Sequence, residues 1–305
     1  MDEFELIRKH FQRPGQDAGP GVLLGPGDDG ALLTPPANAQ LVMTLDTSLA
    51  GRHFPDDLPA ADIGHRCLAV NLSDLAAMGA RPLWFLLSLT LPEGDDAWVG
   101  AFAGGLFALA DRAGIALVGG DMSRGPLSVA IQATGCVAPG KALRRDGARP
   151  GQTIAVTGIP GLGGLGLRHW REGRRDSVAA CHFARPEPAL DWPARLAGAG
   201  AAIDISDGLV QDLQHVLHAS GGLGARIQVA KLPVNDELNE LDDDDRLALQ
   251  LGGGDDYRLL FTWPAGRPLP DGAWAIGEIT GPGPLQIIAP DGRSEMPPPA
   301  GWRHF

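Results

Sequence analysis

The sequence predicts an α+β fold that is divided into two domains. A chain of 305 residues is long enough for two domains with ample cores. Strand-like and helix-like segments are mixed without strict alternation, which favours α+β over a doubly wound sheet. A polar, basic and turn-rich stretch, residues 139–150, separates the two halves. We therefore expect one domain over residues 1–138 and a second over residues 149–305.

The first half contains both kinds of hydrophobic periodicity. Apolar residues at helical spacing predict helices, and alternating or short continuous apolar runs predict strands. The expected helices cover residues 4–12, 61–78 and 96–113. The expected strands cover residues 41–45, 83–91, 115–118 and 127–137.

The second half begins again with a strand and continues with the same mixture. The expected strands cover residues 153–157, 226–230, 257–262 and 273–276. The expected helices cover residues 163–172, 188–199 and 207–219. An acidic run at residues 242–245 precedes a further apolar helix, where negative charge favours the helix dipole.

Composition excludes several classes of protein. Hydrophobic content of 44% and charged content of 20% are typical of a globular chain. A net charge of -12 argues against nucleic acid as a partner. The longest apolar run, at about residues 83–91, is too short to span a bilayer. Anionic small molecules remain compatible with this charge if metal ions supply the positive charge.

Cysteine usage and the N-terminal residues indicate a cytoplasmic protein. Cys67, Cys136 and Cys181 are far apart and form no Cys-x-x-Cys pair, so we expect neither a zinc site nor a disulfide. The first five residues are acidic and lack the apolar core of a signal peptide.

The expected helix over residues 61–78 carries an acid where a buried helix should have none. The helix is apolar on nearly every side, yet Asn71 and Asp74 lie one turn apart on the same side. A buried carboxylate is costly unless a cation or hydrogen-bond donors compensate it. The chain has three lysines and none is nearby. A metal ion is one source of positive charge, and a turn cap or a pair with Arg66 or Arg81 is the other interpretation.

Five further acidic sites follow expected strands or sit in glycine turns. They are Asp28 with Asp29, Asp46, Asp121, Asp204 with Asp207, and Asp255 with Asp256. A single such site is most often an ordinary turn. Together with Asp74 they favour hard cations, magnesium above all, with phosphates supplying further ligands. The neighbouring glycines allow the backbone to approach a phosphate closely.

The site at Asp204 and Asp207 immediately precedes an expected helix. Ser206 is a natural N-cap for the helix over residues 207–219, and Asp207 falls in its first turn.

Other phosphate-binding and catalytic motifs are absent from the sequence, with one exception. There is no P-loop, no protein-kinase signature and no Gly-x-Ser-x-Gly elbow. Residues 161–166 match Gly-x-Gly-x-x-Gly after a strand, which makes a dinucleotide-binding protein the alternative. No well-placed acid follows about twenty residues later, as that motif requires. A glycine-rich turn packed against a helix is therefore the favoured interpretation.

The acidic motifs, in this order, resemble the thiamine-monophosphate kinases. The similarity extends from about residue 4 to the C-terminus and is most specific in Asn71–Ala80. The matching stretches are 27–33, 46–47 with 51–54, 69–80, 119–121 with 124–127, 203–209 and 253–257. The wider superfamily includes aminoimidazole ribonucleotide synthetase and selenophosphate synthetase, which also use ATP and are the nearest alternatives.

The resemblance implies ATP-dependent phosphorylation of thiamine monophosphate to thiamine diphosphate, the last step in making that cofactor. It implies direct in-line transfer assisted by several magnesium ions, without a general base. It also implies a homodimer in which the N-terminal sheets of two chains join. The first domain would bind ATP and metal and form the dimer, and the second would complete the nucleotide and substrate site.

The resemblance also implies roles for individual residues. The matched metal ligands are Asp29, Thr44, Leu45 through its carbonyl, Asp46, Asp74, Asp121, Asp204 and Asp207. The matched ATP-binding residues are Gly120, Asp121, Arg145 and Ser206. The matched substrate-binding residues are His53, Asp255 and Trp302.

Four of these assignments carry an alternative or a departure from the family pattern. Asp255 stands where the family usually has Glu, and Trp302 is matched only through a short C-terminal segment. A loop histidine and a solvated hinge residue are the other interpretations of His53 and Arg145.

Overall fold

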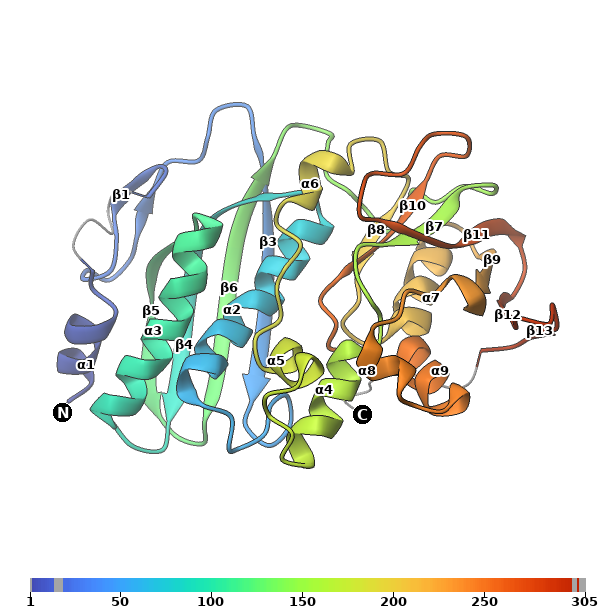
Figure 1. Cartoon of the computed structure of the whole chain (residues 1–305). Helices are drawn as coiled ribbons and strands as arrows, with labels where there is room; N and C mark the ends of the chain where they lie inside the picture. The colour runs from blue at the N-terminus through green and yellow to red at the C-terminus, as the bar shows by residue number, and fades with distance from the viewer. Residues whose placement is uncertain (1, 14–18, 298–300, 302–305) are drawn as a thin grey trace. The chain divides into compact units, whose positions relative to one another are not determined.

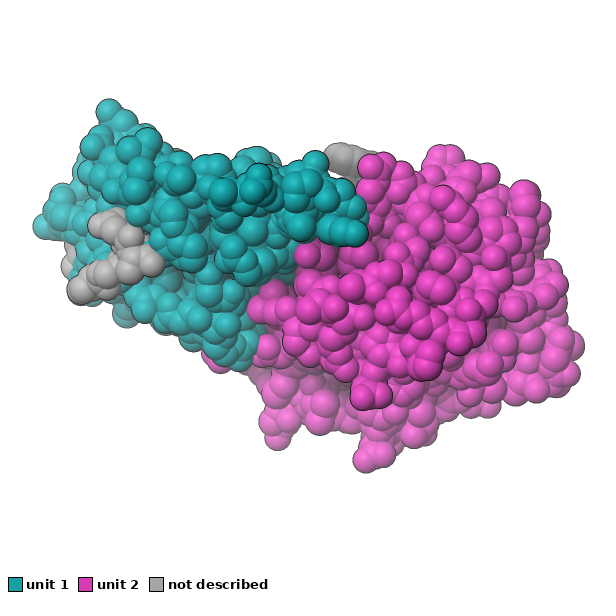
Figure 2. Space-filling view, turned by 90° about the horizontal axis from the view of Figure 1, so that it is seen from above, with its two compact units in different colours: residues 1–75, 80–142 teal, residues 76–79, 143–305 magenta. Residues whose placement is uncertain are grey.

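The computed structural model consists of two compact units, which Figure 2 shows in different colours. Unit 1 comprises residues 1–75 and 80–142, and unit 2 comprises residues 76–79 and 143–305. The structure describes residues 2–13, 19–297 and 301. Helices and strands are mixed in both units, which confirms the predicted α+β class. The functions expected of the two domains stay predictions.

Unit 1 is built on a four-stranded sheet whose strand order is β3-β6-β4-β5. Strands β4 and β5 are parallel, and the other neighbours are antiparallel. The strands are β3 (Gln40–Leu49), β4 (Arg81–Leu91), β5 (Ala116–Arg124) and β6 (Ser128–Val137). The helices are α1 (Glu3–His10), α2 (Ala60–Ala77) and α3 (Asp96–Ala113), and a small hairpin joins β1 (Val22–Leu24) to β2 (Leu32–Leu33).

Helices α2 and α3 cover one face of this sheet (Figure 1). On the other face the β1–β2 hairpin packs over Trp84, and the rest of that face is open. Leu87 and Leu89 of β4 point toward the helices and are buried, whereas the intervening Leu86 is 41% exposed. The predicted buried helix is confirmed, because Leu68, Leu72 and Leu75 of α2 are all fully buried. We call the two faces of the sheet the helix side and the open side.

Two strands extend further than the sequence predicted. Strand β3 continues to Leu49 and β5 continues to Arg124, so Asp46 and Asp121 lie inside strands and not at their ends. Asp46 pairs with Ile131 in a ladder that spans all ten residues of β3. The glycines before Asp121 do not end β5, because Gly120 lies so close to Leu87 of β4 that only glycine fits there.

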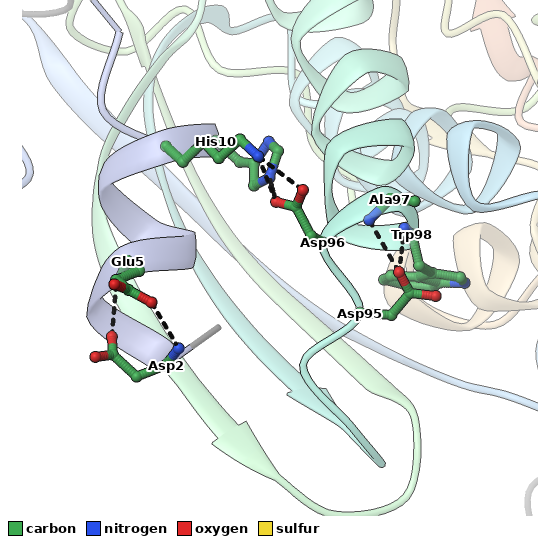
Figure 3. A network of polar contacts seen from close by, with 8 residues as sticks. Asp2, Glu5, His10, Asp95, Asp96, Ala97 and Trp98 are labelled. Carbon is green, nitrogen blue, oxygen red and sulfur yellow. Dashed lines mark hydrogen bonds and ion pairs between the residues drawn. The ribbon is translucent and has the colours of Figure 1, made fainter.

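Helix α1 is attached to the start of α3 by a polar network (Figure 3). Asp2 and Glu5 form a capping box at the start of α1. Asp96 accepts hydrogen bonds from Lys9 Nζ at 2.7 and 2.8 Å and lies 2.7 Å from His10 Nε2. The adjacent Asp95 caps α3 by accepting from the amides of Ala97 and Trp98. These exposed contacts orient α1 more than they stabilise it.

Unit 2 contains a seven-stranded sheet in the order β13-β12-β9-β11-β7-β10-β8, in which only β12 and β9 are parallel. The strands are β7 (Thr153–Val156), β8 (Ala202–Asp204), β9 (Leu223–Gln228), β10 (Leu259–Trp263), β11 (Trp274–Pro282), β12 (Leu285–Ile288) and β13 (Ser294–Glu295). The helices are α4 (Leu162–Arg171), α5 (Val178–Ala184), α6 (Trp192–Arg195), α7 (Leu209–Ala219), α8 (Asp236–Asn239) and α9 (Asp243–Gly252), with a 3₁₀ turn, η2, at Val229–Lys231.

The helix predicted over residues 188–199 is wrong in length. The segment forms only the single turn α6, and α5 precedes it where no helix was predicted. Pro186 and Pro188 prevent a longer helix, and Pro193 fits only because it occupies the first turn of α6. None of the helices among the described residues combines the length and apolarity that crossing a membrane requires.

Helices α2 and α3 approach each other through two glycines, and this contact gives a stability prediction. A Cβ on Gly64 would lie 2.1 Å from the Phe102 carbonyl oxygen, and one on Gly105 would lie 1.8 Å from that of Ala61. We expect Gly64→Ala to lower the free energy of unfolding by about 1–3 kcal/mol, because the helices must separate. Urea denaturation measures this change.

Gly104→Ala is the matched control. Gly104 lies on the same helix, α3, and nothing would contact a Cβ placed there within 4 Å. Alanine has the higher helix propensity, so this variant should be as stable as the wild type or up to about 1 kcal/mol more stable. Equal stability of the Gly64 and Gly104 variants would contradict the close approach.

Candidate functional site

Three of the predicted metal ligands come together on the helix side of unit 1. Thr44 and Asp46 are alternate residues of β3 and therefore point to the same face. The Thr44 hydroxyl donates a hydrogen bond to Asp74 Oδ2 on α2. Burial, the charge of Asp74 and a hydrogen bond with Asp74 together raise the pKa of Asp46 to about 7. We call Thr44, Asp46 and Asp74 the helix-side group.

The charge of the neighbouring Asp46 bears on the two interpretations of Asp74, which are a metal ligand and a partner of an arginine. Two neighbouring carboxylates repel each other, and a cation between them would relieve that repulsion. Of the two arginines that the sequence offers, Arg66 donates to the His53 carbonyl at 3.4 Å and Arg81 lies 3.5 Å from the Cys136 sulfur. The helix-side group consists of two carboxylates and a hydroxyl, which are residue types of a cation site, and both interpretations of Asp74 stay predictions.

Asn71, one turn before Asp74, carries a buried polar atom without a hydrogen-bond partner among the described residues. It is fully buried, and its amide nitrogen donates to the Cys67 carbonyl at 3.0 Å. Its Oδ1 atom has no hydrogen-bond partner among the described residues. An unpaired buried carbonyl costs about 1–3 kcal/mol, and such costs are concentrated at functional sites.

A second set of predicted residues lies on the open side of unit 1. Asp29, Gly120 and Asp121 line a groove of about 1240 Å³, together with apolar residues of the sheet such as Met43 and Leu86. Asp121 accepts a hydrogen bond from the Ser123 hydroxyl at 2.8 Å. The side chain of Leu45 also faces the open side and is 65% exposed. We call Asp29, Gly120 and Asp121 the open-side group.

The helix-side group and the open-side group do not come together within unit 1. The register aligns Asp46 with Ile131, Leu87 and Gly120 on successive strands. Asp46 is thus three strand spacings from the row of Gly120, or about 14 Å. The two groups also face opposite sides of the sheet. The single convergence of carboxylates that the sequence suggested is not formed within this unit.

His53 lies in the turn after β3. Its Nδ1 atom accepts a hydrogen bond from the Leu49 amide at 3.0 Å, so that nitrogen is used to hold the turn. This contact fits the loop-histidine interpretation, and the substrate-binding role stays a prediction.

In unit 2 the structure brings four predicted residues together on two adjoining loops. Strands β8 and β10 pair Asp204 with Leu259. The pairing continues irregularly into the loops, where the amide of Asp255 donates to the Ser206 carbonyl at 2.8 Å and that of Tyr257 donates to Ile205 at 2.8 Å. Asp204, Ser206, Asp207 and Asp255 therefore share one end of the sheet.

The second loop has an unusual backbone. Asp255 and Tyr257 have φ angles of 58° and 49°, which residues other than glycine seldom adopt. The Tyr257 hydroxyl donates to Asp255 Oδ1 at 2.9 Å and so orients the predicted substrate-binding carboxylate. Backbone strain of this kind costs of order 1–3 kcal/mol and persists only where the surrounding structure enforces it.

Two buried carboxylates that the sequence did not assign to the site hold these loops. Asp212 accepts from the amides of Ser206, Asp207 and Gly208, each at 3.1 Å. Burial and the charge of Asp207 raise the pKa of Asp212 to about 7, against the lowering effect of the three amides. The prediction that Ser206 is the N-cap of α7 is wrong. The N-cap position is Gly208, and Asp212 supplies the acceptor for the amides of the turn.

Asp256 is the other buried carboxylate, and it decides the role of the glycine-rich motif. It accepts from the amides of Gly161 at 2.8 Å and Gly163 at 2.9 Å. Burial raises the pKa of Asp256 to about 7, although these two amides oppose the shift. A carboxylate of the chain already occupies the amides that a dinucleotide phosphate would need. The motif is therefore a turn packed against a helix.

A lone acid on an apolar helix face is the signal by which the sequence could have revealed Asp212. Its neighbours at helical spacing, Leu209, Leu213 and Val216, are all buried. The same signal identified Asp74 on its helix.

The structure says less about the last two predicted residues, Arg145 and Trp302. The Arg145 carbonyl accepts from the Ser220 hydroxyl at 3.0 Å, at the C-terminal end of α7. That end is about 16 Å along the helix from Ser206. Trp302 lies outside the described residues. Gly301 lies against Gln211, whose side chain donates to Asp207 Oδ2 at 2.8 Å.

Comparisons with known proteins identify the family of the chain. The family model for the N-terminal domain of AIR synthase related protein matches residues 27–137. The thiamine-monophosphate kinase of Salmonella typhimurium is 44% identical over 270 residues, which cover 86% of this chain and 82% of that protein. The chain belongs to the thiamine-monophosphate kinase family.

Solved structures of thiamine-monophosphate kinases share the fold. The enzyme from Stenotrophomonas maltophilia is 41% identical, with a TM-score of 0.83 and 96% of both chains covered. AaThiL complexed with AMPPCP and TMP is 30% identical, with a TM-score of 0.82 and 89% of both chains covered.

The helix-side group gives a prediction for Asp74. Asp74→Asn should leave the metal-free protein at least as stable as the wild type, because it removes the repulsion of Asp46 while keeping the shape. Activity should fall by several orders of magnitude if Asp74 holds a catalytic metal ion. Thermal melts of metal-free protein, compared with turnover at saturating magnesium, measure both.

The ion-pair interpretation predicts the reverse result. Loss of a buried charge partner would destabilise the protein by about 3–5 kcal/mol and leave turnover at low temperature nearly intact. A destabilised but active variant would refute the metal-ligand role.

Proposed function

We propose that this protein phosphorylates thiamine monophosphate to thiamine diphosphate, with ATP as the donor. The observation that carries the proposal is the likeness to AaThiL complexed with AMPPCP and TMP, which extends over 89% of both chains. Identity of 44% to a thiamine-monophosphate kinase over most of the chain supports the same reaction. The helix-side group and the two loops of unit 2 supply the residue types that the reaction needs.

The acceptor is a phosphate that is already ionised at neutral pH, so the reaction needs no general base. The barrier arises from bringing two anions together and from charge on the transferred group, so positioning and cations dominate. Direct in-line transfer therefore requires no proton-transferring side chain. This accounts for a candidate site that is rich in carboxylates and poor in lysine.

Magnesium is the cation that the residues fit. Thr44, Asp46 and Asp74 present only oxygen atoms, which magnesium prefers. They also hold two mutually repelling carboxylates, which a divalent ion would stabilise. Asp204 and Asp207 offer further carboxylates at the end of the unit 2 sheet, and Asp29, Asp121 and the Leu45 carbonyl are the remaining expected ligands. Bound magnesium would neutralise charge on the phosphates.

Substrate and nucleotide contacts are assigned by the family pattern. Gly120, Asp121, Arg145 and Ser206 are proposed to bind ATP. His53, Asp255 and Trp302 are proposed to bind thiamine monophosphate. The thiazolium ring is cationic, so an indole face or a carboxylate suits it. Tyr257 holds the Asp255 carboxylate in place, which partly offsets its being one methylene shorter than the usual Glu.

A product assay tests the proposed reaction directly. Purified protein incubated with ATP, magnesium and thiamine monophosphate should yield thiamine diphosphate and ADP in equal amounts, separated by chromatography. Formylglycinamidine ribonucleotide and selenide serve as acceptors for the neighbouring superfamily reactions. Turnover of either one, with none of thiamine monophosphate, would overturn the proposal.

Nucleotide binding should depend on magnesium more than on any one basic residue. Because the candidate site is acidic, AMPPCP without magnesium would meet repelling charge. We expect calorimetry to show affinity falling at least tenfold in excess chelator. Equal affinity with and without magnesium would contradict the proposed metal ligands.

We also propose that two chains form a homodimer through the open side of unit 1. Strand β3 is an edge strand of ten residues, and Leu41, Met43 and Leu45 on it are 45–66% exposed. Leu86 of β4 extends this apolar surface. A long, exposed apolar edge and face of this kind is a liability for a monomer. A second copy would cover the groove that holds the open-side group.

Met43→Glu should therefore give a monomer at micromolar concentration, because it buries a charge in the proposed interface. Val234→Glu is the matched control, since Val234 is 40% exposed but lies in unit 2. Sedimentation velocity measures the mass of both variants. A wild-type protein that is monomeric and fully active would rule out the dimer.

A further inference from the structure

The Ser206-Asp207-Gly208 turn is held by one oxygen atom. Asp212 Oδ2 accepts from the backbone amides of three consecutive residues, each at 3.1 Å. Asp212 is 2% exposed and belongs to the buried face of α7. Three hydrogen bonds to one buried acceptor restrict the φ and ψ angles of the whole turn.

The other side of the turn is held as well. The Ser206 carbonyl accepts from the Asp255 amide at 2.8 Å. Gly208 has a φ of 127°, and a Cβ there would lie 2.9 Å from the Gly252 backbone. Both backbone polar atoms of Ser206 are therefore used within the chain, and its hydroxyl makes no hydrogen bond to any described residue.

The turn before α7 consequently has no free amide to offer a ligand. A backbone amide can bind a phosphate only when no group of the protein already accepts from it. Here the carboxylate of Asp212 takes up the amides of Ser206, Asp207 and Gly208. Any contact of Ser206 with a nucleotide must go through its hydroxyl group.

We propose that Asp212 is a positioning residue for nucleotide binding, which presents the Ser206 hydroxyl and the Asp207 carboxylate together by holding the backbone of the turn that carries them. This inference rests on the proposed function only in taking the ligand to be a magnesium-bound nucleoside triphosphate. Asp212 itself is buried beneath the turn and acts through the backbone of the two residues above it.

Hydrogen exchange of the wild-type protein tests the first step. Amides that precede a helix usually exchange quickly because nothing in the helix accepts from them. We expect the amides of residues 206–208 to be protected at least a hundredfold over an exposed loop. Exchange at the rate of an exposed loop would overturn the proposal before any variant is made.

Two substitutions separate the acceptor from the bulk of the side chain. Asp212→Leu replaces the buried carboxylate by an apolar group of similar size and leaves the three amides of the turn without their acceptor. We expect it to fold, to lose protection at residues 206–208 and to bind magnesium-AMPPCP at least tenfold more weakly. Asp212→Asn keeps an acceptor oxygen and should bind within about threefold of the wild type. Unchanged affinity in Asp212→Leu would refute the positioning role.

Glu237→Ala is the control for general destabilisation of unit 2. Glu237 also accepts from two backbone amides, those of Val178 and Ala179 at 2.8 Å each, but it caps α5 and contacts no predicted site residue. It should lower the melting temperature and leave nucleotide affinity unchanged. An equal loss of affinity in this variant would show that Asp212 acts through stability alone.

Ser206→Ala tests the hydroxyl contact. It should weaken nucleotide binding about as much as Asp212→Leu, whereas Ser206→Thr should retain binding. Wild-type affinity in Ser206→Ala would contradict a nucleotide contact through the hydroxyl. The product assay separates the two proposals: Asp212-dependent binding of AMPPCP without turnover of thiamine monophosphate would sink only the proposed reaction.

Discussion

Buried carboxylates are the constraint on which the candidate site depends. Asp212 and Asp256 are buried and Asp46 is half-buried, and burial is the largest cause of a raised pKa at each. A carboxylate in such a place must be compensated or must give up its charge. The chain meets this constraint in two ways. One applies to carboxylates that hold loops in place, and the other to predicted metal ligands.

Asp212 and Asp256 are compensated from within the chain. Asp212 accepts hydrogen bonds from three amides and Asp256 from two. Each thereby fixes a loop that carries predicted site residues. Asp46 instead faces another carboxylate, Asp74, with a threonine hydroxyl beside it. Amides compensate the first two acids, whereas Asp74 raises the pKa of Asp46 further, and this repulsion is what a bound cation would relieve. The pair is therefore the part of unit 1 whose electrostatic energy a metal ion would change most.

Sequence periodicity was sufficient to predict the elements whose apolar residues form a clear pattern and are buried. Helix α2 and strand β4 were predicted because apolar residues recur at helical spacing in the first and form an almost continuous run in the second. The lengths of β3 and β5 were not predictable, because Asp46 and Gly120 read as the end of a strand. They are tolerated inside one because Asp46 faces another polar group and Gly120 presses against Leu87. The prolines before and within α6 shortened a helix that apolar spacing alone had extended.

The candidate site was predictable as a set of residues but not as a geometry. Motifs named Asp46, Asp74 and Asp121 alike, and only the strand order shows that Asp121 lies on the opposite face from the other two. Conversely, Asp207 and Asp255 are 48 positions apart in the sequence, yet the Asp255 amide binds the residue beside Asp207. Long-range pairing of this kind leaves no trace in local spacing. It follows from the β8–β10 ladder, which sets both loops at one end of the sheet.

An overall charge of -12 would couple cation and nucleotide binding at the proposed site. A phosphate that approaches the carboxylates of either unit without a counter-ion is repelled, and a metal ion alone would leave these carboxylates only partly neutralised. Each ligand would therefore lower the electrostatic cost of binding the other, and thermodynamic linkage makes such a benefit mutual. A lysine-rich site would bind the nucleotide without such coupling. An acidic site of the proposed kind would discriminate against metal-free nucleotide.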